Sequence, residues 1–270
     1  MKEVNFPINL GRYVIAPGRK LIAYSVEIKA NRIGILRDIS NVISGKEGDI
    51  MYFHLQINPD KKGLIFMILD ITSMGEDPEE LKKSIEKVEG VGKVFTLRPM
   101  KEGLIIDTHS FPAYVGSNRV VIVRDILLKS AKKELAKRIG DEATNILLYN
   151  IGYEMGLGAG DSHLELARAL GITDPIEVVR LISIPLFKAL GYGYAEIEAV
   201  QEGNTLWRMR IYRDIECEIV GSSNKPACSL ISGMWAGVIT RILGKDVVAK
   251  ETKCRAMGDE YCEIEVELRE

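Results

Sequence analysis

The sequence predicts an α+β protein made of two domains. Three observations lead to this prediction: a strand–helix rhythm in the first hundred residues, a segment rich in proline, glycine and polar residues after it, and a helical stretch that gives way to strands near the C-terminus. The chain has 270 residues, of which 46% are hydrophobic, so each domain can bury a core of its own. We expect a first domain at 1–98, a linker at 99–118 and a second domain at 119–270.

The first domain begins with β-branched, partly alternating segments and two segments with helical periodicity. Apolar residues at positions 35, 36, 39, 42 and 43 recur at the spacing of one helix face, and Gly45 and Gly48 end that helix. A second amphipathic helix is expected at 79–88. Strands are expected at 21–28, 51–57, 64–71 and 91–97. The resulting order βαββαβ predicts an antiparallel sheet with two helices on one face, as in ferredoxin-like domains.

This first segment resembles an ACT-type regulatory domain. The resemblance rests on the βαββαβ order and on residues 32–39 at the first strand-to-helix turn, where Ile33-Gly34 stands in place of the usual Pro-Gly. It implies that Ile33, Gly34 and Ile35 could contact an amino-acid effector at an interface between paired domains. A module of this fold that only dimerises or packs is the open alternative, because a fold alone does not specify a function.

The second domain reads first as helical and then as a mixture of helices and strands. Helices are expected at 124–138, 141–156, 163–170, 175–190 and 229–243, and strands at 194–200, 206–212, 247–255 and 261–268. Gly152 and Gly156 are small positions that favour close helix packing. We interpret Lys132-Lys133 and Lys137-Arg138 as a solvated helix face, and His163 as a surface or capping residue.

Four cysteines lie in the last 54 residues of the chain. Cys254 and Cys262 flank Gly258 symmetrically, so they face each other in a hairpin centred there. Cys228 opens a helix, where the helix dipole favours a thiolate. Glu251 lies three residues before Cys254. Because tetrahedral zinc takes four such donors, these four residues could form a metal site. Buried reduced cysteines, a Cys254–Cys262 disulfide, and a site that uses Cys217 in place of Glu251 are the alternatives.

The same C-terminal stretch resembles the 4-vinyl reductase (V4R) domain. The resemblance rests on residues 228–237, which form a glycine-containing helix opened by a cysteine, and on the pattern Glu-x-x-Cys-x-x-x-Gly-x-x-x-Cys at 251–262. It covers about 150 residues and is looser toward the N-terminal side, where it rests on helix order and residues 149–156.

The V4R resemblance implies a ligand set and a pocket. Similar domains sense aromatic effectors in bacterial phenol- and toluene-responsive activators, where three cysteines and one glutamate hold zinc. Carried over, Cys228, Glu251, Cys254 and Cys262 would hold a structural Zn²⁺ with no open coordination position. Trp207 matches a pocket tryptophan of such sensors, and Trp235, Tyr192 and Tyr194 are weaker candidates. Plain core packing is the alternative for each aromatic residue.

Composition and the lack of catalytic motifs narrow the class of function. Lys and Arg number 36 and Asp and Glu 38, a formal net charge of -2 that argues against a basic nucleic-acid-binding surface. We find no nucleophile–base pair, helix-turn-helix pattern or phosphate loop. No apolar run approaches the roughly 18 residues of a membrane span, and residues 1–5 do not resemble a secretory signal, so we expect a cytoplasmic protein.

The leading prediction is a non-enzymatic, homodimeric sensor of a small hydrophobic or aromatic molecule. A reductase-associated enzyme or assembly factor of tetrapyrrole or cofactor metabolism is the alternative from another class. A scaffold that resembles vesicle-tethering subunits is the third hypothesis.

Overall fold

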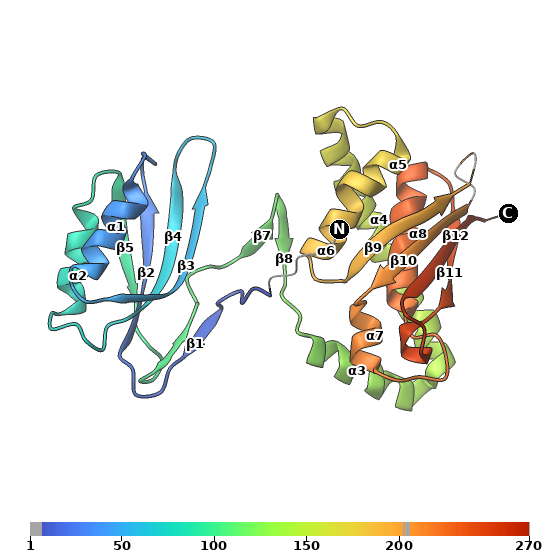
Figure 1. The fold of residues 1–270 in the computed structure, drawn as a ribbon, viewed down its shortest axis with the longest axis horizontal. Helices are drawn as coiled ribbons and strands as arrows, with labels where there is room; N and C mark the ends of the chain where they lie inside the picture. The colour runs from blue at the N-terminus through green and yellow to red at the C-terminus, as the bar shows by residue number, and fades with distance from the viewer. Residues whose placement is uncertain (1–6, 202, 204–205, 270) are drawn as a thin grey trace. The chain divides into compact units, whose positions relative to one another are not determined.

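The chain divides into two compact units, residues 1–121 and 122–270, in a computed structural model that describes residues 7–201, 203 and 206–269 (Figure 1). Both units mix helices with strands, and all the paired strands of the described residues are antiparallel. The predicted mixture of helices with antiparallel sheets is therefore confirmed. No helix in the described part of the chain is both long enough and apolar enough to cross a membrane.

The first unit contains the predicted βαββαβ order. Its elements are β2 (Leu21–Ile28), α1 (Ile35–Ser44), β3 (Asp49–Ile57), β4 (Gly63–Asp70), α2 (Pro78–Glu86) and β5 (Val91–Leu97). The strands are ordered β3-β4-β2-β5. Strand β2 is almost wholly buried because its alternate side chains enter two different cores. Ile22, Tyr24 and Val26 pack in the core that includes α1 and α2 residues, whereas Leu21 and Ala23 pack on the other face.

The segment at 99–118, expected as a linker, contains short strands. Strand β6 (Leu104–Ile106) pairs with β1 (Tyr13–Ile15), and Ile105 is buried against the second face of the sheet. Strands β7 (Ala113–Val115) and β8 (Asn118–Val120) form a hairpin. The compact first unit extends through residue 121 and includes all three strands.

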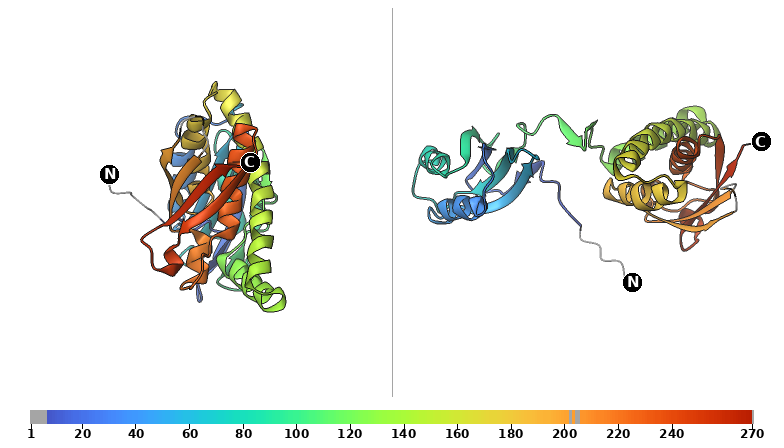
Figure 2. Two further views of the ribbon diagram at one scale, coloured as in Figure 1. Left: turned by 90° about the vertical axis from the view of Figure 1, so that its right-hand side faces the viewer. Right: turned by 90° about the horizontal axis from the view of Figure 1, so that it is seen from above.

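The second unit packs a four-stranded sheet against helices. Its helices are α3 (Asp125–Ile139), α4 (Asp141–Leu170), α5 (Pro175–Val178), α6 (Ile184–Ala189), α7 (Ile215–Val220) and α8 (Ser229–Leu243). Its strands are β9 (Tyr194–Val200), β10 (Leu206–Tyr212), β11 (Val247–Lys253) and β12 (Cys262–Leu268), ordered β11-β12-β10-β9. Helix α8 lies between α4 and the sheet (Figure 2), and its residues from Ile231 to Thr240 are all buried.

The helices of the second unit differ from the sequence prediction in three main respects. The helices expected at 141–156 and 163–170 are one helix, α4, of 30 residues. The glycine-rich stretch 156–160 stays helical, and Gly156 and Gly160 on successive turns of it pack against α8. The helix expected at 175–190 consists of α5, a π-helical turn at Val179–Ser183 and α6. Helix α7 was not predicted, because its six residues are too few for a periodic pattern.

Glycines allow α4 and α8 to meet backbone to backbone. A Cβ atom added at Gly156 would lie 2.2 Å from the carbonyl oxygen of Met234, and one at Gly237 would lie 2.0 Å from that of Tyr153. Gly152 approaches Leu230 in the same way, one turn earlier on both helices. The two helices therefore run parallel, and any side chain at these positions would force them apart.

We predict opposite stability effects for alanine at two glycines of α4. Gly156→Ala should lower the free energy of unfolding by about 1–3 kcal/mol because its Cβ meets the α8 backbone. Gly158→Ala, the matched control, should raise it by about 0.5–1 kcal/mol because nothing lies within 4 Å of the added Cβ. Urea unfolding monitored by tryptophan fluorescence measures this, since the chain's two tryptophans, Trp207 and Trp235, both lie in the second unit. Equal effects at the two positions would contradict the backbone contact.

Candidate metal centre and apolar pocket

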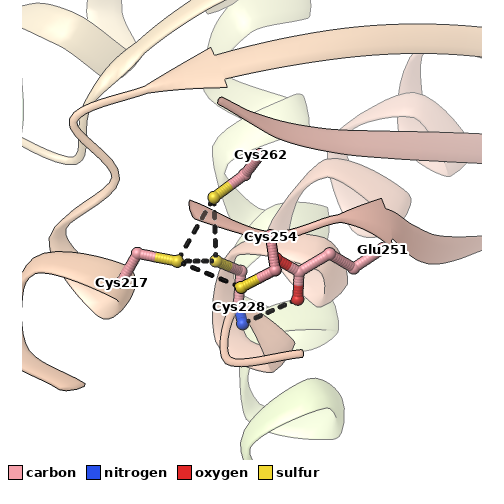
Figure 3. A group of neighbouring side chains, drawn as sticks. All are labelled: Cys217, Cys228, Glu251, Cys254 and Cys262. Atoms are coloured by element: carbon pink, nitrogen blue, oxygen red, sulfur yellow. Dashed lines mark hydrogen bonds between the residues drawn. The ribbon is translucent and has the colours of Figure 1, made fainter. Parts of the chain in front are cut away.

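Four cysteines and one glutamate from separate elements converge in the second unit (Figure 3). Cys217 lies in α7, Cys228 precedes α8, Glu251 lies in β11, Cys254 follows β11 and Cys262 begins β12. One ligand atom from each lies within 4.8 Å of all the others. The four cysteines are buried and all have free thiols, so the cross-strand disulfide considered from the sequence is absent.

The sulfur atoms are nearly at the spacing that a tetrahedral metal requires. The Sγ of Cys217 lies 2.9 Å from that of Cys228, 3.2 Å from that of Cys262 and 3.5 Å from that of Cys254. The edge of a zinc–sulfur tetrahedron is about 3.8 Å, given a Zn–S bond of about 2.3 Å. Cys217, which the sequence suggested only as a substitute for Glu251, is therefore a full member of the cluster.

Glu251 contributes a buried oxygen without a partner. Its Oε2 accepts a hydrogen bond of 2.9 Å from the backbone N–H of Cys228, whereas its Oε1 is buried and has no hydrogen-bond partner. Burial raises the pKa of this carboxyl to about 8. A cation beside Oε1 would satisfy the oxygen and favour the carboxylate, so the residues present fit a metal ion.

Two of the four thiols have lowered pKa values, which favour the thiolate form. The thiol of Cys228 beside Cys254 lowers the pKa of Cys254 to about 6, and the thiols of Cys217 and Cys228 lower that of Cys262 to about 6. The thiolate is the form of cysteine that binds metals. The neighbouring thiol of Cys217 raises the pKa of Cys228, and burial raises that of Glu251, so a metal ion that bound these two residues would displace their protons.

Local structure explains why the five side chains meet. Asp214 caps α7 by accepting hydrogen bonds from the backbone N–H groups of Glu216 (2.7 Å) and Cys217 (3.1 Å). The register that pairs Lys253 with Glu263 brings Cys254 opposite Cys262. Gly258 has φ +109°, which lets the chain reverse between the two cysteines.

A buried ion pair that sequence reasoning missed holds the surrounding elements together. Lys132 Nζ lies 2.6 Å from Glu216 Oε1 and 2.7 Å from the carbonyl oxygen of Ala227. The other oxygen of Glu216 accepts a hydrogen bond of 3.2 Å from the Ile231 N–H. Lys132 thus joins α3 to α7 and to the segment before α8, which corrects its interpretation as part of a solvated face.

A second feature is a small apolar pocket between α4, α6 and α8, with a volume of about 40 Å³. The rings of Phe187 and Trp235 have centroids 5.2 Å apart, and those of Phe187 and Tyr192 are 5.6 Å apart. The Nε1 of Trp235 is buried and has no hydrogen-bond partner. The lining residues are Ala159, His163, Ser183, Leu186, Phe187, Leu190, Tyr192, Met234, Trp235 and Val238.

His163 lines this pocket rather than the surface. It is buried, and its Nδ1 lies 2.9 Å from Ser183 Oγ. Burial lowers its pKa to about 4, so the imidazole is neutral near pH 7. The sequence could have predicted this burial, because His163 is spaced from Gly156, Gly160 and Ala167 so that all four residues lie on one face of α4.

The other residues singled out from the sequence lie in different places. Trp235 and Tyr192 line the pocket, whereas Trp207 is fully buried in the core and is not among the lining residues. Tyr194 stacks on Tyr212, with ring centroids 5.9 Å apart, on the sheet face opposite to its buried neighbour Ala195. The structure therefore does not bring Tyr194 to the tryptophans.

The three positions of the ACT-like turn lie in the first unit and differ in exposure. Ile33 is fully exposed, Gly34 precedes α1 with φ +89°, and Ile35 is buried in the core beneath the helix. Of the two side chains at these positions, only that of Ile33 is available to an effector from solvent.

We predict that His163 makes stability depend on pH. Its pKa is lower in the folded state, so the unfolded chain binds more protons as the pH falls from 6.5 to 4. The contribution is fully present above pH 6.5, and its loss at lower pH should reduce the free energy of unfolding by up to about 3 kcal/mol. Urea unfolding at several pH values should show a shallower dependence in His163→Leu than in the wild type. His54→Gln, which changes an exposed residue of β3, should keep the wild-type slope. An unchanged slope in His163→Leu would contradict the assignment.

The cluster of four cysteines and Glu251 lies in a segment that is similar to a known domain. Residues 207–268 match the V4R domain, and this segment includes all four cysteines and Glu251. The first tryptophan, Trp207, stands at its start.

The chain is also similar to bacterial regulators. It is 21% identical over 201 residues to the phenol regulator MopR of Acinetobacter guillouiae, covering 71% of this chain and 34% of MopR. It is 24% identical over 197 residues to the transcriptional regulatory protein XylR of Pseudomonas putida, covering 70% of this chain and 31% of XylR. The match thus spans about a third of the length of these regulators.

A solved structure shares the fold. The phenol-responsive sensory domain of the transcription activator PoxR, determined with phenol, superposes with a TM-score of 0.52 at 16% identity. The superposition covers 57% of this chain and 79% of the PoxR domain.

Proposed function

We propose that this protein is a small-molecule sensor whose second unit binds a small hydrophobic or aromatic molecule in the pocket beside α8. The observation that carries the proposal is the buried, unpartnered Nε1–H of Trp235 in a pocket lined with aromatic rings. An unpaired buried donor costs free energy, and a ligand oxygen would satisfy it. The similarity to a phenol regulator and to a phenol-responsive domain supports an aromatic ligand with a hydroxyl group.

The pocket must widen when it binds such a molecule. Its volume of about 40 Å³ is well below that of an engineered cavity that holds benzene, about 150 Å³. Leu190 and Tyr192 lie where the chain leaves α6, and Met234 is a flexible side chain. Ligand binding would displace these side chains and shift α6 relative to α8, which is the kind of change that a sensor needs.

We further propose that Cys228, Glu251, Cys254 and Cys262 hold a structural zinc ion. Four protein ligands leave no position for a reactive water molecule, so the ion would link α8 to the β11–β12 hairpin. The buried Oε1 of Glu251 favours this set over four cysteines, because a four-sulfur site would leave that oxygen without a partner. Cys217 would then remain a neutral thiol that donates a hydrogen bond to a ligand sulfur.

Helix α8 connects the two sites. Cys228 directly precedes the helix, and Met234, Trp235 and Val238 of the same helix line the pocket. We propose that the output is carried by a partner or by dimer geometry. In this proposal the ACT-like segment 1–98 pairs subunits of a cytoplasmic homodimer, and an amino-acid effector could contact its turn at Ile33.

Native mass spectrometry should find one zinc ion per chain that is lost on acid denaturation. Cys254→Ser should lose the zinc because it removes a ligand. Glu251→Gln should weaken zinc binding by more than about 100-fold, whereas Cys217→Ser should change it by less than about 10-fold, since serine can still donate a hydrogen bond. A competition titration with a zinc chelator measures these affinities. Loss of zinc in Cys217→Ser but not in Glu251→Gln would instead establish a four-sulfur site, and a zinc-free wild-type chain would contradict the metal proposal.

Phenol should raise the melting temperature of the protein, and the rise should grow with the logarithm of the phenol concentration once that concentration exceeds the dissociation constant. Trp235→Phe keeps an aromatic ring but lacks the N–H, so phenol affinity should fall by about 5–10-fold, the value of one hydrogen bond. Toluene, which has no acceptor, should bind both forms alike. Tyr194→Phe, on the opposite sheet face, should bind phenol as the wild type does. An equal loss in the two variants, or no ligand effect on the wild type, would contradict the pocket assignment.

A further inference from the structure

A groove of the second unit has five lysines among its fifteen lining residues. It lies between α3, the start of α4, α7 and the segment 223–227, and its volume is about 490 Å³. Lys129, Lys132, Lys133, Lys137 and Lys225 line it, and Asp141 supplies the one carboxylate among the lining residues. The whole chain has a formal net charge of -2, so this concentration of positive charge is local.

Helix α3 directs its lysines to the groove by their spacing. Lys129, Lys133 and Lys137 are four residues apart, and Lys132 and Ala136 fall between them, so all five lie on one helix face. An amphipathic helix would carry apolar side chains at these positions, yet α3 contains no buried residue. Like charges at this spacing repel each other, so an anion in the groove would relieve the repulsion.

Three of the lysines have no acidic partner. Lys132 is paired with Glu216, and Lys137 lies 2.6 Å from Glu134 on its own helix. No Asp or Glu within the described ranges lies at salt-bridge distance from Lys129, Lys133 or Lys225. These three ammonium groups therefore remain available to a ligand.

The remaining lining of the groove is partly apolar and partly made of uncharged polar residues. Ile219 and Val220 come from α7, and Pro226 and Ala227 come from the segment that leads to Cys228. A groove of this volume is within the usual range of small-molecule sites, about 300–1,000 Å³. A ligand that matches it has negative charges for the lysines and an uncharged body for the apolar wall.

We infer that this groove binds an organic phosphate of about nucleotide size through the ammonium groups of Lys129, Lys133 and Lys225. Lysine suits phosphate because it acts as a compact point charge with three donors. The inference goes beyond the proposed function and is independent of it, because the groove and the apolar pocket share no lining residue.

Calorimetric titration of the full, zinc-loaded chain with ADP, pyrophosphate and adenosine tests this site. ADP and pyrophosphate should bind, ADP more tightly because its nucleoside meets the apolar wall, and adenosine should bind at least about 10-fold more weakly than ADP. The ADP affinity should fall as the salt concentration rises. Metal content is measured after each titration, because phosphates also bind metal ions.

Two charge-matched double variants separate the groove from general surface charge. Lys129→Gln/Lys133→Gln should lower the ADP affinity by about 10-fold or more, equivalent to about 1.4 kcal/mol. Lys245→Gln/Lys250→Gln changes the net charge equally at exposed positions outside the groove and should keep the affinity within about twofold of the wild type. If the first variant loses helical circular dichroism, Lys225→Gln supplies the same comparison from a loop.

Two results would overturn the inference. One is the absence of ADP and pyrophosphate binding to the wild type up to about 1 mM. The other is an equal loss of affinity in the groove and control variants. Thermal shift by phenol in Lys129→Gln/Lys133→Gln reports the apolar pocket separately, so failure of the groove is distinguishable from failure of the proposed function.

Discussion

The close parallel contact between α4 and α8 is the constraint on which the second unit depends. Glycines at 152, 156, 233 and 237 bring the two backbones together, and there is no space for a Cβ atom at any of them. The contact holds α8 between α4 and the sheet, with ten consecutive residues buried. Both candidate sites are built on this helix: Cys228 stands at its start, and Trp235 faces the pocket from its middle. A shift of α8 would therefore alter both sites together.

The cysteine–glutamate cluster is held in place by an ion pair as well as by helices. The segment between Cys217 and Cys228 passes from α7 to α8. Lys132 forms an ion pair with Glu216 and donates a hydrogen bond to the carbonyl oxygen of Ala227, at the two ends of this segment. Because that ion pair is buried, removing either partner would leave an uncompensated charge next to the cluster. The lysine groove lies on the outer side of the same segment, so the cluster and the groove share a wall. An occupant of the groove and an ion in the cluster would each restrict this segment.

Two features of the apolar pocket determine which ligand suits it: one hydrogen-bond donor without a partner and one neutral histidine. The walls are apolar, the indole N–H of Trp235 has no partner, and burial keeps His163 uncharged beside Ser183. Such a site favours an uncharged aromatic hydroxyl compound over an anion, whereas the lysine groove has the opposite preference. The two sites could therefore respond to two chemically different molecules on one scaffold.

The sequence by itself determined the elements whose signal is local. Strand alternation and helix periodicity predicted the βαββαβ order, the C-terminal sheet strands and α8. The spacing of Glu251, Cys254 and Cys262 around Gly258 brought these residues together because a hairpin has a fixed register. The alternation of side chains along β9 could also have shown that Tyr194 does not line the pocket. Tyr194 lies on the same sheet face as Glu196 and Glu198, and the buried Ala195 lies on the other face.

Only the tertiary structure decided the rest. Cys217 lies in α7, which is too short for a periodic pattern. It contacts Cys262, although the two residues are 45 positions apart in the sequence. Lys132 is partly buried because Glu216 and Ala227 pack beside α3, and nothing in the sequence of that helix indicates this contact. The glycine-rich stretch of α4 remains helical because α8 covers it. In each case the deciding contact is distant in sequence, so local propensity could not reveal it.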